Sequence, residues 1–129
     1  MRLLLDTHIW LWSLNDESRL GHRTLAELRD PANELWLSPV STWEALILYE
    51  KGRFNLHAEP YEWIVRAIAP FREAPFTHEI AAASRRLHLP QRDPADRFLA
   101  ATAKVLGLTL LTADANLLGL GEIATLGNR

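Results

Sequence analysis

The stretch Arg2-Leu3-Leu4-Leu5-Asp6 decides the fold, because a run of apolar residues ends directly at a carboxylate. A short run of this kind is typical of a strand that is buried on both faces of a parallel sheet. The apolar residues from Ile9 to Trp12 then indicate the beginning of a helix. We therefore expect a strand followed by a helix at the start of the chain, with Asp6 at the junction.

The same alternation of short apolar runs and helical segments continues along the chain. Further strands are predicted at residues 35–37, 73–76, 108–112 and 122–126. Further helices are predicted around residues 25–28, from Ser38 or Ser41 to about Lys51, over residues 60–69, from Thr77 to about Leu87, and from Asp93 to just before Gly107. Strands separated by helices imply parallel crossovers. The pattern thus predicts an α/β fold in which helices cover both faces of one central, mainly parallel sheet.

Composition narrows the class of protein further. The 129 residues, 48% of them hydrophobic and 23% charged, predict a single globular domain over residues 1–129. The chain has no cysteine, which excludes disulfides, thiolate metal sites and a cysteine nucleophile. A net charge of −2 excludes a wholly basic clamp on nucleic acid. Asp6 interrupts the N-terminal apolar run, and no charge-free run is long enough to span a membrane, so we expect a cytoplasmic protein.

Five acidic residues map to one edge of the predicted sheet. In such folds the carboxyl ends of the strands lie beside the beginnings of the helices that follow them. Asp6 ends the first strand, Asp114 follows the strand at 108–112, and Glu44, Asp93 and Asp96 lie in predicted first helical turns. We therefore expect these five carboxylates to share one rim.

Each acid also has a local explanation, with one exception. Glu44 completes a capping box with Ser41, Asp93 and Asp96 suit the beginning of a helix, and Asp114 suits a turn. For Glu44 or Asp93 taken alone, capping is the stronger interpretation. Asp6 follows a buried strand directly, and capping does not explain it.

Electrostatics favours a joint role if the acids do meet. Two carboxylates about 4 Å apart repel each other by roughly 4 kcal/mol at an effective dielectric constant of 20. A domain with a total stability of about 5–15 kcal/mol requires something to offset several such repulsions. Protonation, arginine pairing or a divalent cation would do so, and an all-oxygen set of ligands suits Mg²⁺ or Mn²⁺. Such an ion activates water for attack on a phosphodiester, so that no protein nucleophile is needed.

Four blocks of the sequence resemble those of the PIN-domain ribonucleases, and within them the VapC toxins of bacterial toxin–antitoxin pairs. The resemblance extends over essentially the whole chain. Its blocks are Leu3-Leu4-Leu5-Asp6-Thr7, then Ser38-Pro39-Val40-Ser41-Thr42-Trp43-Glu44, then residues 92–103 with Asp93-Pro94-Ala95-Asp96-Arg97, and finally Leu110-Leu111-Thr112-Ala113-Asp114.

This resemblance implies a PIN-like three-layer fold and a Mg²⁺-dependent endoribonuclease, with Mn²⁺ as a substitute. The acidic quartet is then Asp6, Glu44, Asp96 and Asp114, with Asp6, Asp96 and Asp114 as metal ligands. Asp93 is an N-cap with a possible indirect role at the metal. The resemblance also implies an RNA substrate, a homodimer and a VapB-like antitoxin. One departure is His8, because many members of the family carry asparagine at this position.

Several other residues are candidates for supporting roles. The hydroxyls of Thr7, Ser41 and Thr112 stand beside the acids and either orient them or cap helices locally. Arg97, next to Asp96, is the candidate for holding a substrate phosphate, whereas Arg85, Arg86 and Arg92 suit a solvated face equally well. Five tryptophans in so small a domain indicate a large aromatic core or a buried interface with a protein partner.

Two other classes of function remain open from the sequence. A receiver-like signalling domain also has an acidic Mg²⁺ pocket, but it would carry an acidic pair after the first strand and a lysine after the late strand. This chain has neither feature. A catalytically inactive PIN-like interaction module is the other alternative, and the presence of all four acids argues against it.

Overall fold

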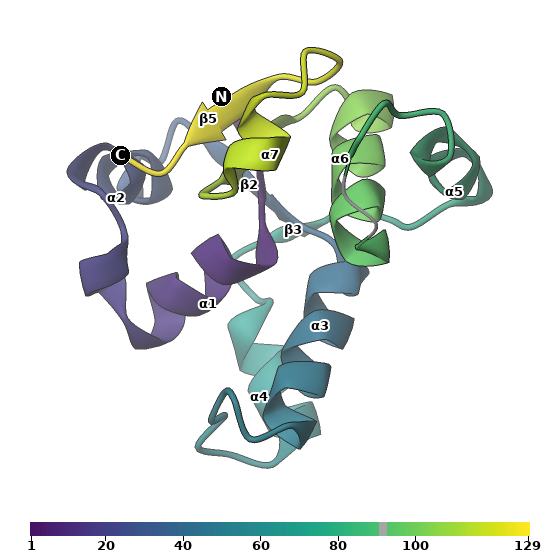
Figure 1. The fold of residues 1–129 in the computed structure, drawn as a ribbon. Coiled ribbons are helices and arrows are strands. Elements are labelled where there is room, and N and C mark those ends of the chain that lie inside the picture. The colour runs from purple at the N-terminus through teal and green to yellow at the C-terminus, as the bar shows by residue number, and fades with distance from the viewer. Residues whose placement is uncertain (91–92) are drawn as a thin grey trace.

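The structure is a computed structural model that describes residues 1–90 and 93–129 (Figure 1). Its strands are β1 (Arg2–Leu5), β2 (Glu34–Leu37), β3 (Arg72–Glu73), β4 (Thr109–Thr112) and β5 (Thr125–Gly127). Its α-helices are α1 (Thr7–Asn15), α2 (His22–Arg29), α3 (Pro39–Glu50), α4 (Pro60–Ala67), α5 (His78–Ser84), α6 (Pro94–Leu106) and α7 (Ala115–Leu118). A single 3-10 turn, η1 (Glu17–Arg19), joins α1 to α2.

The strands form one sheet with β1 at its centre. The order is β3-β2-β1-β4-β5, and all four neighbouring pairs are parallel. In this register Leu4 lies opposite Trp36 of β2 and opposite Leu110 of β4. The predicted α/β fold with a parallel sheet is therefore confirmed, and the carboxyl ends of all the strands lie along one edge.

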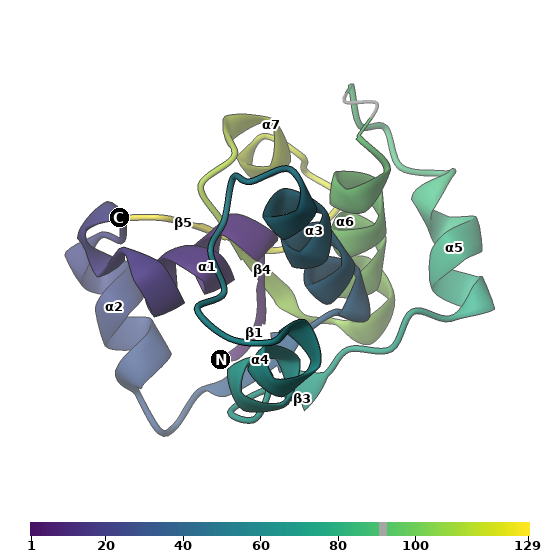
Figure 2. The ribbon, with the colours of Figure 1, turned by 90° about the horizontal axis from the view of Figure 1, so that it is seen from below.

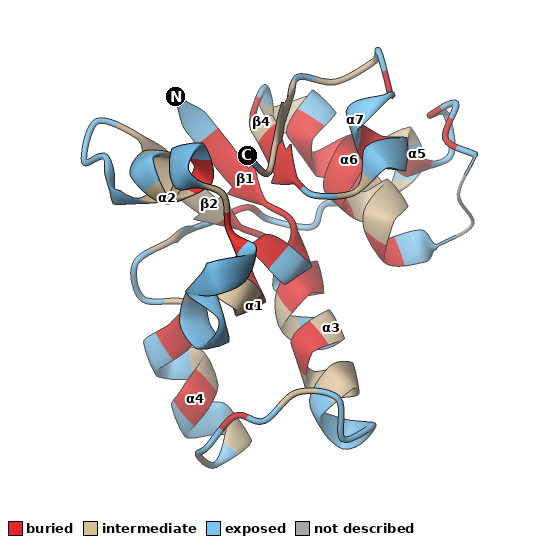
Figure 3. Cartoon of the chain, turned by 60° about the vertical axis from the view of Figure 1, so that its left-hand side comes forward, coloured by how far each residue is buried: buried red, intermediate tan, exposed pale blue. Residues whose placement is uncertain are grey.

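Helices cover both faces of the sheet, which gives the three layers expected. Leu4 and Leu110 pack on the face that is covered by α5, α6 and α7. Leu3, Leu5 and Leu111 point to the opposite face, which is covered by α1, α2 and α4. Figure 2 shows the two groups of helices on either side of the sheet, and Figure 3 shows the buried residues of β1 between them. Alternation of side chains along each strand produces this division, because successive residues point to opposite faces.

Several predicted boundaries were wrong by a few residues, and local chemistry explains two of the three largest differences. The strand predicted at 73–76 consists of Arg72–Glu73, because Pro75 has no amide hydrogen to donate to the ladder. The helix predicted to reach Leu87 ends at Ser84, whose carbonyl accepts a hydrogen bond from the Arg97 guanidinium. The last strand begins at Thr125 rather than at residue 122.

None of the helices in the described ranges combines the length and the apolar character that crossing a membrane would require.

The segment after β5 fastens α2 to the sheet. The Arg129 carbonyl accepts hydrogen bonds from the amides of Arg23 and Thr24 in the first turn of α2, and the Asn128 side chain accepts from the amide of Gly21. Gly21 lies so close that a Cβ atom placed on it would stand 1.5 Å from the Arg129 carbonyl carbon. The absence of a side chain at Gly21 therefore permits this contact.

We predict that Gly21→Ala lowers the free energy of unfolding by about 1–2 kcal/mol, because the new methyl group displaces Arg129 from the two α2 amides. Urea denaturation monitored by circular dichroism measures the change. Gly121→Ala is the matched control, since its Cβ would meet no atom within 4 Å. Equal stability of the two variants would show that the Arg129 contact contributes nothing.

Candidate active site

A pocket with a volume of about 380 Å³ lies at the carboxyl edge of the sheet and gathers all five predicted acids. Its walls come from the ends of β1 and β4 and from the helices α1, α3, α6 and α7. The lining residues are Asp6, Thr7, His8, Trp12, Glu44, Asp93, Asp96, Ala113 and Asp114. Residues up to 108 positions apart in the sequence therefore meet because parallel strands end side by side.

Three of these acids cap helices and line the pocket at the same time. One oxygen of Asp93 accepts from the Ala95 amide at 3.0 Å, and one oxygen of Asp114 accepts from the Asn116 amide at 2.9 Å. Asp6 caps α1 in a similar way through the Thr7 amide at 2.8 Å, so the expectation that capping does not account for Asp6 was wrong. A carboxylate has two oxygens and each can accept more than one hydrogen bond, so a capping bond does not prevent the same side chain from lining the pocket. The two interpretations of these acids are therefore compatible.

Glu44 reaches the pocket from a different place in its helix than the sequence suggested. The N-cap of α3 is Ser38, which accepts from the Val40 amide at 3.0 Å, so Ser41 lies inside the helix. Glu44 therefore lies beyond the first turn, and the predicted capping box with Ser41 was wrong. Its carboxylate instead accepts a hydrogen bond from the Thr7 hydroxyl, which links α3 to α1.

The three predicted hydroxyl groups hold the acids in place. The Thr112 hydroxyl donates to the second oxygen of Asp6 at 2.6 Å and accepts from the Asp114 amide at 3.0 Å. The Thr7 hydroxyl lies 2.9 Å from that of Ser41 in addition to its contact with Glu44. Because Thr7, Ser41 and Thr112 are all buried, these bonds fix the rotamers of Asp6 and Glu44.

Burial and mutual repulsion raise the pKa values of three carboxyls in the pocket. Burial raises the pKa of Asp96 to about 7, and the charges of Asp6, Asp93, Asp114 and Glu44 add to this effect. Burial also raises the pKa of Asp6, against the hydrogen bond from Thr112 that lowers it. The pKa of Glu44 is raised mainly by burial, with the charges of Asp6 and Asp93 adding to it. The site therefore favours either a bound proton or a bound cation at neutral pH.

The donor atoms fit a hydrated Mg²⁺ or Mn²⁺ ion better than a fully caged one. Within residues 1–90 and 93–129, no three Asp, Glu or His side chains form a group arranged to hold a metal ion. Mg²⁺ commonly keeps several water ligands and binds only one or two carboxylates directly. The pocket offers the carboxylate oxygens of five acids beside the Thr7 hydroxyl and the His8 imidazole, and its volume of about 380 Å³ leaves room for such waters. The set of three direct ligands Asp6, Asp96 and Asp114 stays a prediction.

Comparison with known proteins agrees with this geometry. A family model of the PIN domain matches residues 3–123, which is nearly the whole chain and includes every acid of the pocket. The chain belongs to the PIN-domain family. The ribonuclease VapC22 of Mycobacterium tuberculosis is 30% identical over 118 residues, which cover 89% of this chain and 88% of that protein. The chain is thus a VapC-like PIN domain.

Two solved structures show the same fold over nearly the whole chain. DNA-bound VapBC from Salmonella typhimurium has a TM-score of 0.75 at 14% identity and covers 100% of this chain and 99% of its own. FitAcB from Neisseria gonorrhoeae has a TM-score of 0.70 at 23% identity, with 98% and 97% coverage. At these identities the likeness shows the fold, and the PIN-like three-layer arrangement predicted from the sequence is confirmed.

Arg97 has a structural contact in this PIN domain, whichever other role it plays. Its guanidinium donates at 2.9 Å each to the carbonyl of Ser84, the last residue of α5, and to that of Leu89, between α5 and α6. It is not among the residues that line the acidic pocket. The substrate-binding role of Arg97 stays a prediction, and these bonds show that it fastens α5 to α6. Arg85 and Arg86 are exposed, as a solvated face requires, and Arg92 lies outside the described residues.

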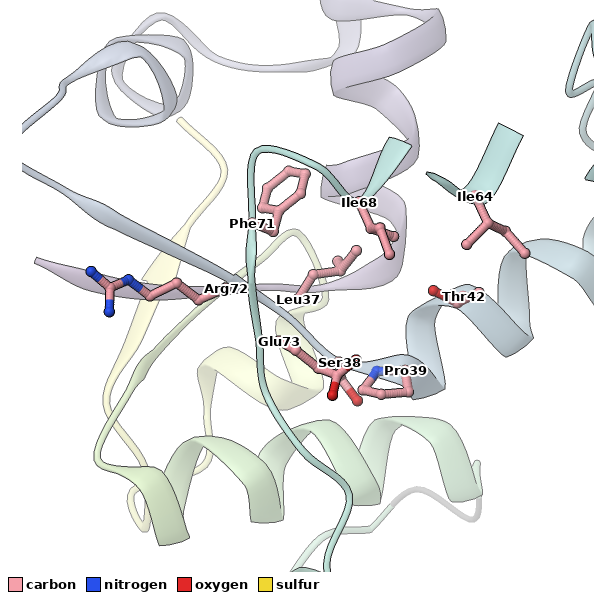
Figure 4. A pocket seen from close by; sticks show the side chains of 9 residues that line it. All are labelled: Leu37, Ser38, Pro39, Thr42, Ile64, Ile68, Phe71, Arg72 and Glu73. Atoms are coloured by element: carbon pink, nitrogen blue, oxygen red, sulfur yellow. The ribbon is translucent and has the colours of Figure 1, made fainter. Parts of the chain in front are cut away.

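A second hollow beside the sheet has a different character (Figure 4). It has a volume of about 230 Å³ and lies where β2 and β3 meet α3 and α4. Leu37, Ile64, Ile68 and Phe71 give it a mainly apolar lining. Its single carboxylate, Glu73, cannot provide a cation site alone, so the chemistry of the PIN domain is assigned to the acidic pocket.

Trp12 was not predicted to line the pocket, and His8 was identified only as a departure from the family pattern. Both residues line the acidic pocket, and their rings stack on each other. Their spacing of four along α1 was the available signal, because residues i and i+4 lie on the same face of a helix. A helix that begins at a site acid therefore also brings its first two turns to the site.

We predict that Asp96→Asn stabilises the protein at pH 8 in the presence of a chelator. The pKa of Asp96 rises from 3.8 to about 7 on folding, so the folded state binds this proton more tightly than the unfolded chain. The free energy of unfolding of the parent therefore falls as the pH rises between these values. Allowing for solvent screening of a half-buried group, the variant gains on the order of 1–2 kcal/mol at pH 8. Urea denaturation should show this gain shrinking toward pH 5, and identical curves at pH 8 would contradict it.

Proposed function

We propose that this VapC-like PIN domain is a Mg²⁺-dependent endoribonuclease that hydrolyses RNA phosphodiester bonds, with Mn²⁺ able to replace Mg²⁺. The observation that carries the proposal is the convergence of Asp6, Glu44, Asp96 and Asp114 on one pocket. The similarity of the chain to the ribonuclease VapC22 supports RNA as the substrate. A divalent ion bound there would activate water and stabilise the charge of an attacked phosphodiester.

The side chains of the pocket have distinct parts in this proposal. Asp6 is the most constrained acid, because it is only 8% exposed and Thr7 and Thr112 hold both of its oxygens. Asp96 in α6 and Asp114 at the beginning of α7 line the same pocket and would hold the cation together with Asp6. Glu44 closes the α3 side of the pocket through its contact with Thr7. Without a bound cation the pKa of the Asp96 carboxyl is about 7, so a cation that binds near neutral pH would displace a proton from it.

We also propose that the protein is the toxin of a toxin–antitoxin pair, that it acts on RNA in the cytoplasm, and that it assembles as a homodimer and with a VapB-like antitoxin. The structural relatives are described as VapBC or FitAB assemblies, which supports a protein partner. An apolar patch outside the pocket offers surface for such contacts. It comprises Pro39, Val40, Trp43, Phe76 and Phe98, with Trp43 55% exposed and the Phe76 and Phe98 rings 4.6 Å apart.

The other two functions are less well supported. A receiver-like signalling domain conflicts with the match of nearly the whole chain to the PIN family. A catalytically inactive PIN module would not need five carboxylates in one pocket, since their repulsion lowers stability without a cation. The activity itself is the test that separates this module from the enzyme.

We predict that the purified chain cleaves RNA in Mg²⁺ and that the cleavage stops in EDTA. Asp6→Asn and Asp96→Asn should each reduce the rate by about 100-fold or more, because each removes a charge that faces the cation. Gel analysis of a labelled RNA measures the rate, and circular dichroism confirms that the variants fold. Asp30→Asn is the matched control on an exposed carboxylate at the end of α2 and should cleave like the parent. Unchanged cleavage by the two pocket variants would contradict the assignment.

A further inference from the structure

One wall of the acidic pocket is aromatic rather than charged. His8 and Trp12, in the first and second turns of α1, both line the pocket, and their ring centroids are 5.9 Å apart with planes inclined by 22°. The Arg19 guanidinium from η1 lies over the Trp12 ring, 5.1 Å from its centroid. His8 is exposed and Trp12 is half-buried. We call His8 and Trp12 together the aromatic wall.

The arrangement holds the exposed ring in position. α1 begins at Asp6, so the helix that presents the aromatic wall also carries a site acid at its N-cap. The Trp12 ring makes two contacts, a stacking contact with the His8 ring and a cation–π contact with the Arg19 guanidinium. Both kinds of contact stabilise the position of an aromatic ring. Because the contact with Trp12 already orders the His8 imidazole beside the carboxylates, this side chain would lose little conformational freedom when RNA binds.

The charge of the pocket makes such a surface useful for binding RNA. Five of the nine lining residues are acidic, and neither Arg nor Lys lines the pocket in the described part of the chain. Basic side chains that neutralise phosphates usually supply much of the affinity for a nucleic acid. Stacking of bases on aromatic rings gives attraction that does not depend on opposite charge, and it is worth about 1–3 kcal/mol per base.

We propose that the aromatic wall is a base-stacking subsite, on which an unpaired RNA base next to the cleaved phosphodiester packs against the His8 ring. This inference rests on the ribonuclease function proposed above and adds the residues that would contact an unpaired base beside the cleavage site. A paired base inside a helix has no free face for His8, so single strands, loops and bulges are the expected substrates. The other candidate for this surface is a segment of the antitoxin. We favour RNA, because the aromatic wall lies in the same pocket as the five carboxylates proposed to act on the phosphodiester.

Binding of a short single-stranded RNA tests the inference without relying on turnover. The parent for this test is the Asp96→Asn chain with Mg²⁺, and fluorescence anisotropy of a labelled oligonucleotide gives the Kd. His8→Ala and Trp12→Ala should each weaken binding by roughly 5- to 150-fold, the equivalent of the stacking energy of one base. His8→Phe should restore most of the binding, because a phenyl ring stacks as well but cannot carry charge. Tyr61→Ala, which removes an aromatic ring that is 80% exposed on α4, should have no effect.

An abasic oligonucleotide identifies the contact as stacking. Removing one base at a time along the RNA should reveal a position whose loss weakens binding to the parent but has little further effect on His8→Ala. In the active chain, His8→Ala should raise KM more than it lowers kcat, and a duplex of the same sequence should be cleaved poorly.

Each outcome decides a different part of the proposal. Unchanged RNA binding by His8→Ala and Trp12→Ala, with cleavage intact, would overturn the stacking subsite and leave the ribonuclease in place. Loss of antitoxin binding with RNA binding retained would assign the aromatic wall to the protein partner and also overturn it. Absence of any RNA binding or cleavage by the chain would overturn both the subsite and the proposed function.

Discussion

Repulsion among carboxylates at the end of a parallel sheet is the constraint on which the structure of the site depends. β1 lies at the centre of the sheet and delivers Asp6 to the edge, where α3, α6 and α7 bring the other acids. Burial raises the pKa of Asp6, Glu44 and Asp96 because each loses hydration as a charged group, and their neighbours add repulsion. A marginally stable domain tolerates this only if hydrogen bonds, protons or a cation compensate.

Hydrogen bonds within the fold offset part of this repulsion, because the carboxylates that line the pocket also accept hydrogen bonds from the backbone and from threonine side chains. Asp6, Asp93 and Asp114 each accept a backbone amide at the beginning of a helix, where the positive end of the helix dipole favours negative charge. Thr7 and Thr112 donate to further oxygens on Glu44 and Asp6. These contacts orient the acids before any ion or substrate arrives, and such preorganisation distinguishes an active site from a set of acids that only cap helices.

Much of this arrangement was predictable from the sequence because the parallel fold converts order along the chain into position. The apolar run before Asp6 and the one before Asp114 fixed the two central strands, and the rim followed from general rules for α/β sheets. Glu44 was placed correctly in the pocket but wrongly in its helix, since Ser38-Pro39 is the true beginning of α3. Trp12 was missed because a tryptophan on a helix is as suited to the core as to a pocket. Only the direction in which α1 leaves Asp6 shows whether Trp12 lies in the core or lines the pocket.

The most direct measurement of the central claim is calorimetric titration of the protein with Mn²⁺ in two buffers of different ionisation enthalpy. If the carboxylates form a cation site, binding is saturable and at pH 7 releases a fraction of a proton, because the pKa of Asp96 is about 7. The release falls toward zero at pH 8.5, and Asp6→Asn weakens the binding strongly. Absence of saturable binding by a folded protein at both pH values would contradict the account.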